Sequence, residues 1–364
     1  MNLNWLLPDL KYFLHTDKPL PHALLVTGAA GIGKSAFSTK LAEGLLCETP
    51  KIKREYGLAC GKCQACHWLS QGSHPDLRRV MPAAFDPSYD PSYIAPTASI
   101  DVDTGEEGVE KDSEKKKSSE ITVDQIRAMT RFLSVGGHRS GVRVVLIDPA
   151  MAMNNIAANA FLKTLEEPLG NTLIVLLATR ASQISATLRS RCVLHTLTVP
   201  SQAEVQQFLR ENAAYGESKT VAAPEPEELN QALQMAGGMP LRALALVRGQ
   251  ESASYRLALD VLRALPETGW QQASEQMAQL STPLWMGVMQ YWVADLARVA
   301  SGSAPARFGT FATTLDCLAR APKLNTAEMM KFIQWLDQNR RWASHPLNPR
   351  LFAEETLMRY CKLF

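Results

Sequence analysis

The stretch Gly28-Ala-Ala-Gly-Ile-Gly33-Lys34-Ser35 decides how the rest of this sequence is interpreted, because it fits the phosphate-loop pattern G-x-x-x-x-G-K-S/T at every fixed position. Gly28, Gly31 and Gly33 allow the backbone to wrap closely and to point its N–H groups at phosphate oxygens. Lys34 would place a cation against the β- and γ-phosphates, and the Ser35 hydroxyl would ligate Mg²⁺. The motif therefore predicts a site for ATP or ADP with magnesium.

The residues on either side place this loop between a strand and a helix. Residues 22–27, His-Ala-Leu-Leu-Val-Thr, form a short, mostly apolar run that stops at a glycine, which is typical of a buried strand. Residues 34–46 then continue at helical spacing. A strand, a glycine-rich loop and a helix in this order open an α/β domain. The alternative is a glycine-rich turn that matches the pattern by chance.

Further apolar runs follow at 142–148, 173–179 and 193–197, with helical stretches between them. Strands that alternate with helices favour a parallel sheet, with its ligand at the carboxyl ends of the strands. After Pro200 the strands stop and the pattern is helical. The predicted fold is thus an α/β phosphate-loop domain with a parallel sheet and a metal module, followed by a small helical unit and an all-helical domain.

Asp148 ends the strand predicted at 142–148 and is our candidate for the carboxylate that holds the magnesium of the nucleotide. An ordinary strand-end aspartate is the alternative. The next residue, Pro149, offers neither a general base nor a backbone N–H. We therefore expect nucleotide binding with little or no intrinsic hydrolysis. Thr179, at the end of the following strand, could act as a sensor hydroxyl or could simply be a threonine that favours a strand.

Three closely spaced cysteines, Cys60, Cys63 and Cys66, follow the first predicted helix of this domain, with two residues between neighbours. This spacing lets thiolates share one tetrahedral ion, and four soft ligands favour a structural Zn²⁺. An iron–sulfur cluster and free structural cysteines are the alternatives. The residues that can supply a fourth ligand are Cys47, His67 and His74.

Two arginines follow the third predicted strand, in Leu188-Arg-Ser-Arg191-Cys192. Arginines on a short polar turn are often no more than solvated surface. In nucleotide-hydrolysing assemblies, however, an arginine finger reaches the γ-phosphate bound by a neighbouring subunit and accelerates hydrolysis by about 10³–10⁵. Both interpretations are open for this turn.

The 364 residues suit two or three domains, and 38 basic against 36 acidic side chains leave a net charge of only +2. That balance argues against a protein that holds DNA through its own charge, so nucleic-acid contacts should be local or shared with partners. No apolar run is long enough to span a bilayer, and the first residues do not resemble a secretory signal. Four clustered cysteines among seven indicate a metal site in a reducing compartment, so we expect a cytoplasmic protein without a membrane role.

We expect the nucleotide-binding domain to cover residues 1–200, with the cysteine module at about 47–66. Residues 82–120 are rich in Pro, Ser, Gly and charge and cannot bury enough apolar surface to offset their ordering entropy, which predicts a flexible surface insertion. Residues 201–250 are predicted to form a small helical unit, which the family resemblance given below identifies as a lid. Residues 251–364 are predicted to form a helical C-terminal domain, to which the family resemblance given below assigns oligomerisation.

A series of motifs in a fixed order resembles the clamp-loader subunits of bacterial DNA polymerase III, which are AAA+ proteins. The motifs are the phosphate loop, the four cysteines, Ala158-Asn-Ala-Phe-Leu-Lys-Thr-Leu-Glu-Glu-Pro168, Leu-Leu-Ala-Thr179 and Ser-Arg-Cys192. The resemblance covers most of residues 20–200. Beyond residue 200 it rests on helical character and one Gly-x-x-x-Arg-Ala-Leu segment.

Among these subunits the chain looks most like the delta-prime type. The gamma/tau motor type is similar in its phosphate loop and cysteines, but it has an Asp-Glu pair where this chain has Asp148-Pro149. The motor also has a sensor arginine where this chain has Leu241. Arg242 comes one position late, a shift of about 100° around a helix. Some delta-prime relatives have lost the phosphate loop, whereas this chain keeps it whole.

The resemblance implies an AAA+ module, a lid and a helical collar that joins gamma/tau and delta subunits in a ring. That ring opens the sliding clamp and places it on primer-template DNA during replication. It is part of the DNA-directed DNA polymerase III holoenzyme, a nucleotidyltransferase, although no polymerase carboxylate pair is visible in this chain. The resemblance also implies that Cys47 is the fourth zinc ligand and that Arg191 is an arginine finger acting in trans.

Two other functions remain open from the sequence. One is an ATP-hydrolysing motor subunit of the gamma/tau or helicase-loader type, for which Pro149 is the discriminating residue. The other is a zinc-dependent nucleic-acid-binding module with a vestigial phosphate loop. The near-neutral charge and the lack of interleaved basic and aromatic residues argue against this second alternative.

Overall fold

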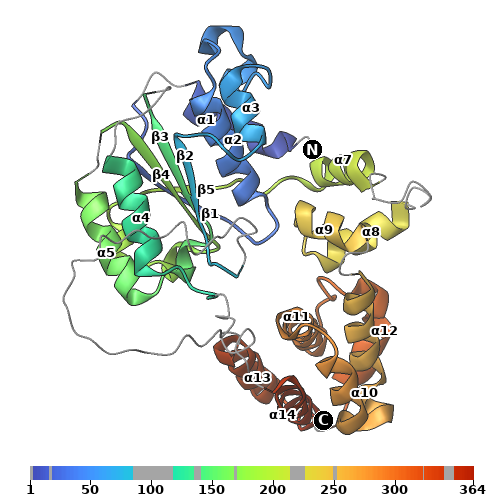
Figure 1. The fold of residues 1–364 in the computed structure, drawn as a ribbon. Helices are drawn as coiled ribbons and strands as arrows, with labels where there is room; N and C mark the ends of the chain where they lie inside the picture. The colour runs from blue at the N-terminus through green and yellow to red at the C-terminus, as the bar shows by residue number, and fades with distance from the viewer. Residues whose placement is uncertain are drawn as a thin grey trace, which may run out of the picture. The chain divides into compact units, whose positions relative to one another are not determined.

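The computed structural model divides the chain into two compact units, Asn2–Pro200 and Ser201–Phe364 (Figure 1). We describe each unit by itself. The predicted insertion at 82–120 falls mostly outside the described residues, and the division at residue 250 between lid and C-terminal domain stays a prediction. The residues that the structure describes are 3–15, 19–84, 118–134, 141–167, 170–213, 226–248, 252–322, 324–339 and 348–364.

A five-stranded parallel sheet forms the centre of the first unit, in the order β2-β3-β4-β1-β5 (Figure 1). All side chains of the three central strands are buried, as expected of largely apolar runs in a parallel sheet. The predicted fold class is confirmed. One strand, with the sequence Leu-Arg-Arg-Val, is not among those that the sequence predicts. The strands are β1 (Ala23–Thr27), β2 (Leu77–Val80), β3 (Arg143–Ile147), β4 (Thr172–Ala178) and β5 (Val193–Thr196).

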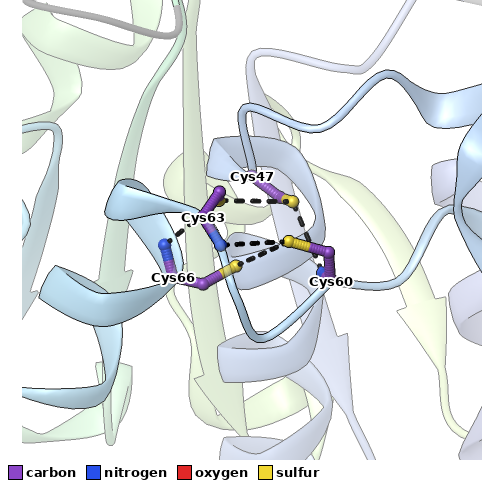
Figure 2. Close-up of side chains that lie close together, drawn as sticks. All are labelled: Cys47, Cys60, Cys63 and Cys66. Atoms are coloured by element: carbon purple, nitrogen blue, oxygen red, sulfur yellow. Dashed lines mark hydrogen bonds between the residues drawn. The ribbon is translucent and has the colours of Figure 1, made fainter.

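Helices cover both faces of this sheet. One face carries α1 (Leu7–Leu14) and α2 (Lys34–Leu46), and the cysteine module with α3 (Gln64–Ser70) follows directly after α2 (Figure 2). The other face carries α4 (Val123–Ser134) and α5 (Asn155–Glu166). The shorter helices are η1 (Asn4–Leu6), η2 (Lys51–Lys53), η3 (Glu55–Gly57), η5 (Ala150–Ala152), η6 (Ala181–Gln183) and α6 (Ala186–Arg189).

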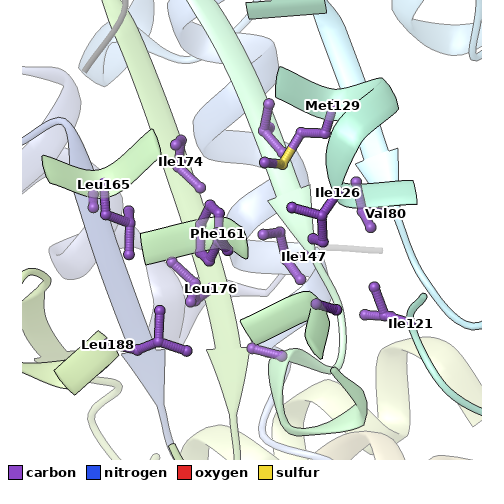
Figure 3. Close-up of a cluster of buried hydrophobic side chains, with 14 of the residues drawn as sticks. Val80, Ile121, Ile126, Met129, Ile147, Phe161, Leu165, Ile174, Leu176 and Leu188 are labelled. Atoms are coloured by element: carbon purple, nitrogen blue, oxygen red, sulfur yellow. The ribbon is translucent and has the colours of Figure 1, made fainter. Parts of the chain in front are cut away.

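The face of the sheet under α4 and α5 holds a continuous apolar core (Figure 3). Phe161 of α5 is fully buried in this core, together with Ile147 of β3 and Leu176 of β4. Asn154 starts α5, because its Oδ1 accepts a hydrogen bond from the Ala157 N–H at 2.9 Å. This cap and the apolar stripe of α5 together fix the helix on the sheet.

The second unit contains only helices among its described residues. Its centre is aromatic: Trp285 and Trp292 of α11 are fully buried, and the Trp292 indole donates to the Tyr360 hydroxyl at 2.9 Å. Asp295 accepts three backbone N–H groups from residues 306–308. The helices are α7 (Gln202–Ala213), α8 (Pro226–Met235), α9 (Pro240–Val247), α10 (Ser252–Ala278), α11 (Thr282–Ala300), η7 (Gly309–Phe311), α12 (Ala312–Ala319), α13 (Thr326–Asn339) and α14 (Pro349–Cys361).

In the part of the chain that the structure describes, no helix has the length and apolar character needed to cross a bilayer.

Two substitutions on α5 test the packing of the core. Phe161→Ala should lower the free energy of unfolding of the first unit by about 3–5 kcal/mol, because it leaves a cavity under the helix. Ile156→Ala on the same helix should change it by less than about 0.5 kcal/mol, because 68% of that side chain is exposed. Urea unfolding followed by circular dichroism measures both, and equal effects would contradict this packing.

Candidate functional site

The phosphate loop lies between the end of β1 and the start of α2. Gly31 and Gly33 have φ angles of 85° and 109°, in the left-handed region that strains residues with a side chain. Gly33 is also the N-cap of α2. The loop therefore needs glycine at these positions, and it ends at the positive end of a helix dipole, where phosphate groups bind favourably.

The Lys34 ammonium lies within this loop. Its Nζ donates hydrogen bonds to the carbonyl oxygens of Gly28 at 2.9 Å and Ala29 at 3.0 Å. Burial lowers the pKa of this amine, and the nearby charge of Asp148 opposes that shift. A cation held at this place is suited to bind the phosphate groups of a nucleotide.

Asp148 and Ser35 meet at the carboxyl edge of the sheet. Asp148 follows β3, Ser35 lies in the first turn of α2, and the Ser35 hydroxyl donates a hydrogen bond to Asp148 Oδ2. In the sheet, only β4 separates β3 from β1. Hydroxyl and carboxylate oxygens are ligands that Mg²⁺ accepts, so this pair fits the magnesium of a bound nucleotide.

Two residues beside this pair concern hydrolysis. Pro149 follows Asp148 through a cis peptide bond and carries no group that could orient or deprotonate a water molecule. Thr179 follows β4 and is partly buried. Because Ala178 pairs with Thr27, Thr179 and Gly28 leave the sheet at the same level. This geometry is compatible with a sensor hydroxyl, and the role of Thr179 stays a prediction.

Arg191 lies at the surface of the first unit, just after α6. Its guanidinium forms an ion pair with Glu166 of α5, with 2.5 Å between Nη2 and Oε1, and donates to the Thr187 carbonyl at 2.8 Å. About a third of the Arg191 side chain is exposed. Exposed ion pairs contribute little stability, and the role of Arg191 as an arginine finger stays a prediction.

Arg242 belongs to the second unit. Its guanidinium donates to the Tyr291 hydroxyl at 3.2 Å and lies 5.2 Å from the centre of that ring. Arg307 covers the same ring at 3.6 Å. These contacts hold Arg242 against α11.

The four cysteines of the module lie together as free thiols (Figure 2). All four Sγ atoms are within 4.8 Å of one another, with 3.8 Å from Cys47 to Cys63 and 3.9 Å from Cys60 to Cys66. Thiolates at about 2.3 Å from a tetrahedral ion lie about 3.8 Å apart. The set therefore fits a closed, four-coordinate metal site.

Hydrogen-bond donors surround these sulfurs. The backbone N–H groups of Lys62 and Cys63 lie 3.4 Å and 3.3 Å from Cys60 Sγ, and the N–H of Cys66 lies 3.4 Å from Cys63 Sγ. The Thr49 hydroxyl donates to Cys60 Sγ at 3.1 Å, and this bond is the main reason why the pKa of Cys60 is lowered to about 5. Donors of this kind favour the thiolate, which is the form that binds metal.

The fourth position of the site is taken by Cys47, which directly follows the last residue of α2. Among the described residues, the group that could hold a metal ion consists of the four cysteines, without a histidine. His67 is exposed, and His74 Nδ1 accepts the backbone N–H of Asp76 at 3.1 Å. The position of Cys47 at the end of α2 brings it to the module, and the identity of the metal stays a prediction.

A family model described as "DNA polymerase III, delta subunit" matches residues 6–201, more than half of the chain. The chain belongs to this family. The matched segment covers the first unit from α1 to β5, so it contains the phosphate loop, the four cysteines and Arg191.

Relatives from several bacteria carry the name DNA polymerase III subunit delta'. The protein from Pseudomonas aeruginosa is 33% identical over 225 residues, which cover 62% of this chain and 55% of that protein. The protein from Escherichia coli is 28% identical over 295 residues, which cover 80% of this chain and 74% of that protein. The match to the first of these relatives thus spans little more than half of its length.

A solved structure from Thermotoga maritima, described as a DNA polymerase III, gamma subunit-related protein, is also similar to this chain. It is 17% identical, with 98% of both chains covered and a TM-score of 0.44.

Sequence reasoning did not single out Trp5, Thr49 or Glu166. Trp5 lies 27 residues before the carbonyl that it binds, and Glu166 lies 25 residues before Arg191. In neither pair do the two residues lie in the same helix or strand. The available signal was the tryptophan itself, because a tryptophan is usually buried and its indole N–H then usually has a hydrogen-bond partner.

Metal content tests the cysteine cluster. The wild-type chain should hold one metal ion, and Cys63→Ser should lose most of it, because a hydroxyl is a poor replacement for a thiolate ligand. Cys317→Ser is the matched control, since Cys317 is exposed and lies outside the cluster. Mass-spectrometric metal analysis after purification without chelator measures the content. A wild-type chain that takes up no metal would rule out the site.

Proposed function

We propose that this chain works as the delta-prime subunit of a DNA polymerase III clamp loader, where it binds nucleotide with little or no hydrolysis. The observation that carries the proposal is the family match over the first unit, combined with a complete phosphate loop whose Asp148 is followed by Pro149. The complete loop would allow the nucleotide to bind, whereas Pro149 would not support its hydrolysis.

The residues of the site support nucleotide binding. Backbone N–H groups of the loop and the ammonium of Lys34 would hold the phosphate groups. Ser35 and Asp148 would hold the Mg²⁺, which neutralises charge on the phosphate oxygens when it is bound. Proline at position 149 leaves the attacking water without a general base at the place where motor subunits have a glutamate.

Arg191 is proposed to act on a neighbouring subunit. In the isolated chain its guanidinium pairs with Glu166. In a ring, it would exchange this carboxylate for the γ-phosphate bound by the adjacent motor subunit and stabilise the charge that develops during hydrolysis. The subunit would then contribute to catalysis without hydrolysing nucleotide itself.

The proposed partners are the gamma/tau and delta subunits, joined through the helical second unit, with the sliding clamp and primer-template DNA reached through the assembly. We propose that the four cysteines hold Zn²⁺ in a structural role, because a closed site leaves no position for a substrate. This role places the chain in the cytoplasm, where bacterial DNA is replicated.

The alternative function is an ATP-hydrolysing motor subunit of the gamma/tau or helicase-loader type. The same phosphate loop and cysteines would serve it equally well. It requires a residue that activates water, and Pro149 cannot do so. We therefore prefer the role of a delta-prime subunit that hydrolyses little or no nucleotide.

Nucleotide binding and hydrolysis by the purified chain test the first part of this proposal. The wild type should bind Mg-ADP and Mg-ATP, and Lys34→Ala should weaken binding about ten- to a hundredfold through loss of a charge-assisted contact. Lys53→Ala, at an exposed lysine of η2, is the control and should change nothing. Titration calorimetry measures affinity. A steady-state rate near that of motor ATPases would favour the alternative function.

The arginine finger is tested in the reconstituted loader. Arg191→Ala should lower hydrolysis at the adjacent motor site by about 10³ or more. Arg189→Ala is the matched control, because Arg189 lies two residues away and its guanidinium donates to the Ala181 carbonyl of its own chain. The clamp- and DNA-stimulated ATPase rate is measured after gel filtration has shown intact assembly. An unchanged rate in the Arg191 variant would remove the assignment.

A further inference from the structure

A buried tryptophan of the N-terminal segment forms a hydrogen bond to the backbone of the phosphate loop. The Trp5 indole Nε1 donates a hydrogen bond to the carbonyl oxygen of Ile32 at 2.9 Å. Only 4% of Trp5 is exposed and Ile32 is fully buried, so water does not compete for this bond. Ile32 lies between Gly31 and Gly33, in the part of the loop where two φ angles are positive.

This bond fixes the direction of an N–H group on the other side of the loop. The carbonyl of Ile32 and the N–H of Gly33 belong to one planar peptide and point in opposite directions. A carbonyl held by Trp5 therefore directs the Gly33 N–H away from the indole. The flexible backbone of Gly33 would otherwise let this peptide rotate, because glycine restricts rotation least.

The segment that carries Trp5 is itself anchored to the sheet. Asp9 of α1 binds His195 of β5, with 3.1 Å between Oδ1 and Nε2. The His195 ring is stacked on Phe37 of α2, with 5.8 Å between ring centres. Leu10, in the same turn of α1 as Asp9, is also buried. The segment that carries the indole donor is thus held in place by β5 and α2.

Strand β5 also contacts the residue before the loop. The hydroxyl groups of Thr27, which precedes the loop, and Thr196 of β5 lie 2.9 Å apart. The loop is therefore held at its beginning by β5 and near its end by the N-terminal segment, which in turn rests on β5. Such bracing lowers the entropy that the loop loses when a ligand binds.

We propose that Trp5 is a positioning residue for nucleotide binding: its indole N–H fixes the Ile32–Gly33 peptide so that the Gly33 N–H is preset to bind a nucleotide phosphate. This inference rests on the nucleotide binding proposed above. It assigns the N-terminal segment a function that the loop motif alone does not contain.

The test removes the indole donor while keeping the ring. Trp5→Phe, and replacement of Trp5 by benzothienylalanine, in which sulfur takes the place of the indole N–H, should each weaken Mg-ADP binding about five- to tenfold in titration calorimetry. In the nucleotide-free protein, amide hydrogen exchange of the segment 28–35 should become faster in both variants, because the Ile32–Gly33 peptide is released.

The matched control is Trp292→Phe. It removes a buried indole hydrogen bond of the same 2.9 Å length in the second unit. This variant should lower the melting temperature yet leave Mg-ADP affinity and loop exchange unchanged. If both Trp5 variants bind Mg-ADP like the wild type, or if Trp292→Phe weakens binding as much, the role of Trp5 is overturned.

The two proposals fail separately. A wild-type chain that binds no Mg-ADP contradicts the proposed nucleotide binding. In that case hydrogen exchange decides the role of Trp5 in shaping the loop, and an unchanged exchange rate in the variants overturns it.

Discussion

The parallel pairing of β3, β4 and β1 is the constraint on which the rest of the first unit depends. Their side chains are all buried, so the register that aligns Thr27 with Ala178 and Ile147 with Leu176 is fixed by apolar packing on both faces of the sheet. Parallel strands end at the same edge. The loop after β1, Asp148 after β3 and Thr179 after β4 therefore come together, although more than a hundred residues separate Gly28 from Asp148.

The candidate site brings together the phosphate loop, Lys34, Ser35 and Asp148. Its loop, lysine and Ser35–Asp148 pair are suited to a phosphate chain with magnesium, yet proline occupies the position where water would be activated. The half-buried Arg191 is held by a surface ion pair with Glu166 and by a hydrogen bond to the Thr187 carbonyl. Under the function proposed above, the loop would bind nucleotide and Arg191 would act on the nucleotide bound by a neighbouring subunit.

Much of the fold followed from the sequence because the signals were local. Apolar runs predicted the central strands, and the spacing of Cys60, Cys63 and Cys66 predicted a metal site. Contacts between distant residues could not be predicted in this way. Strand β2 was not predicted, because two of its four residues are arginine. The hydrogen bond from Trp5 to the loop was not predicted, because it joins residues without a local sequence pattern. The fourth thiol, Cys47, lies 13 residues before Cys60 and needed the family resemblance to be chosen.

The position of the cysteines also affects how the chain is made. All four lie between residues 47 and 66, whereas β1 cannot pair with β4 and β5 until residues 172–196 have left the ribosome. Loop closure over twenty residues costs less entropy than closure over one hundred and fifty. If the four thiols bind a metal ion, as proposed above, they could do so during translation, while the sheet is incomplete. The concentration of metal in the cell would then affect the folding of the cysteine module in the nascent chain, before the nucleotide site has formed.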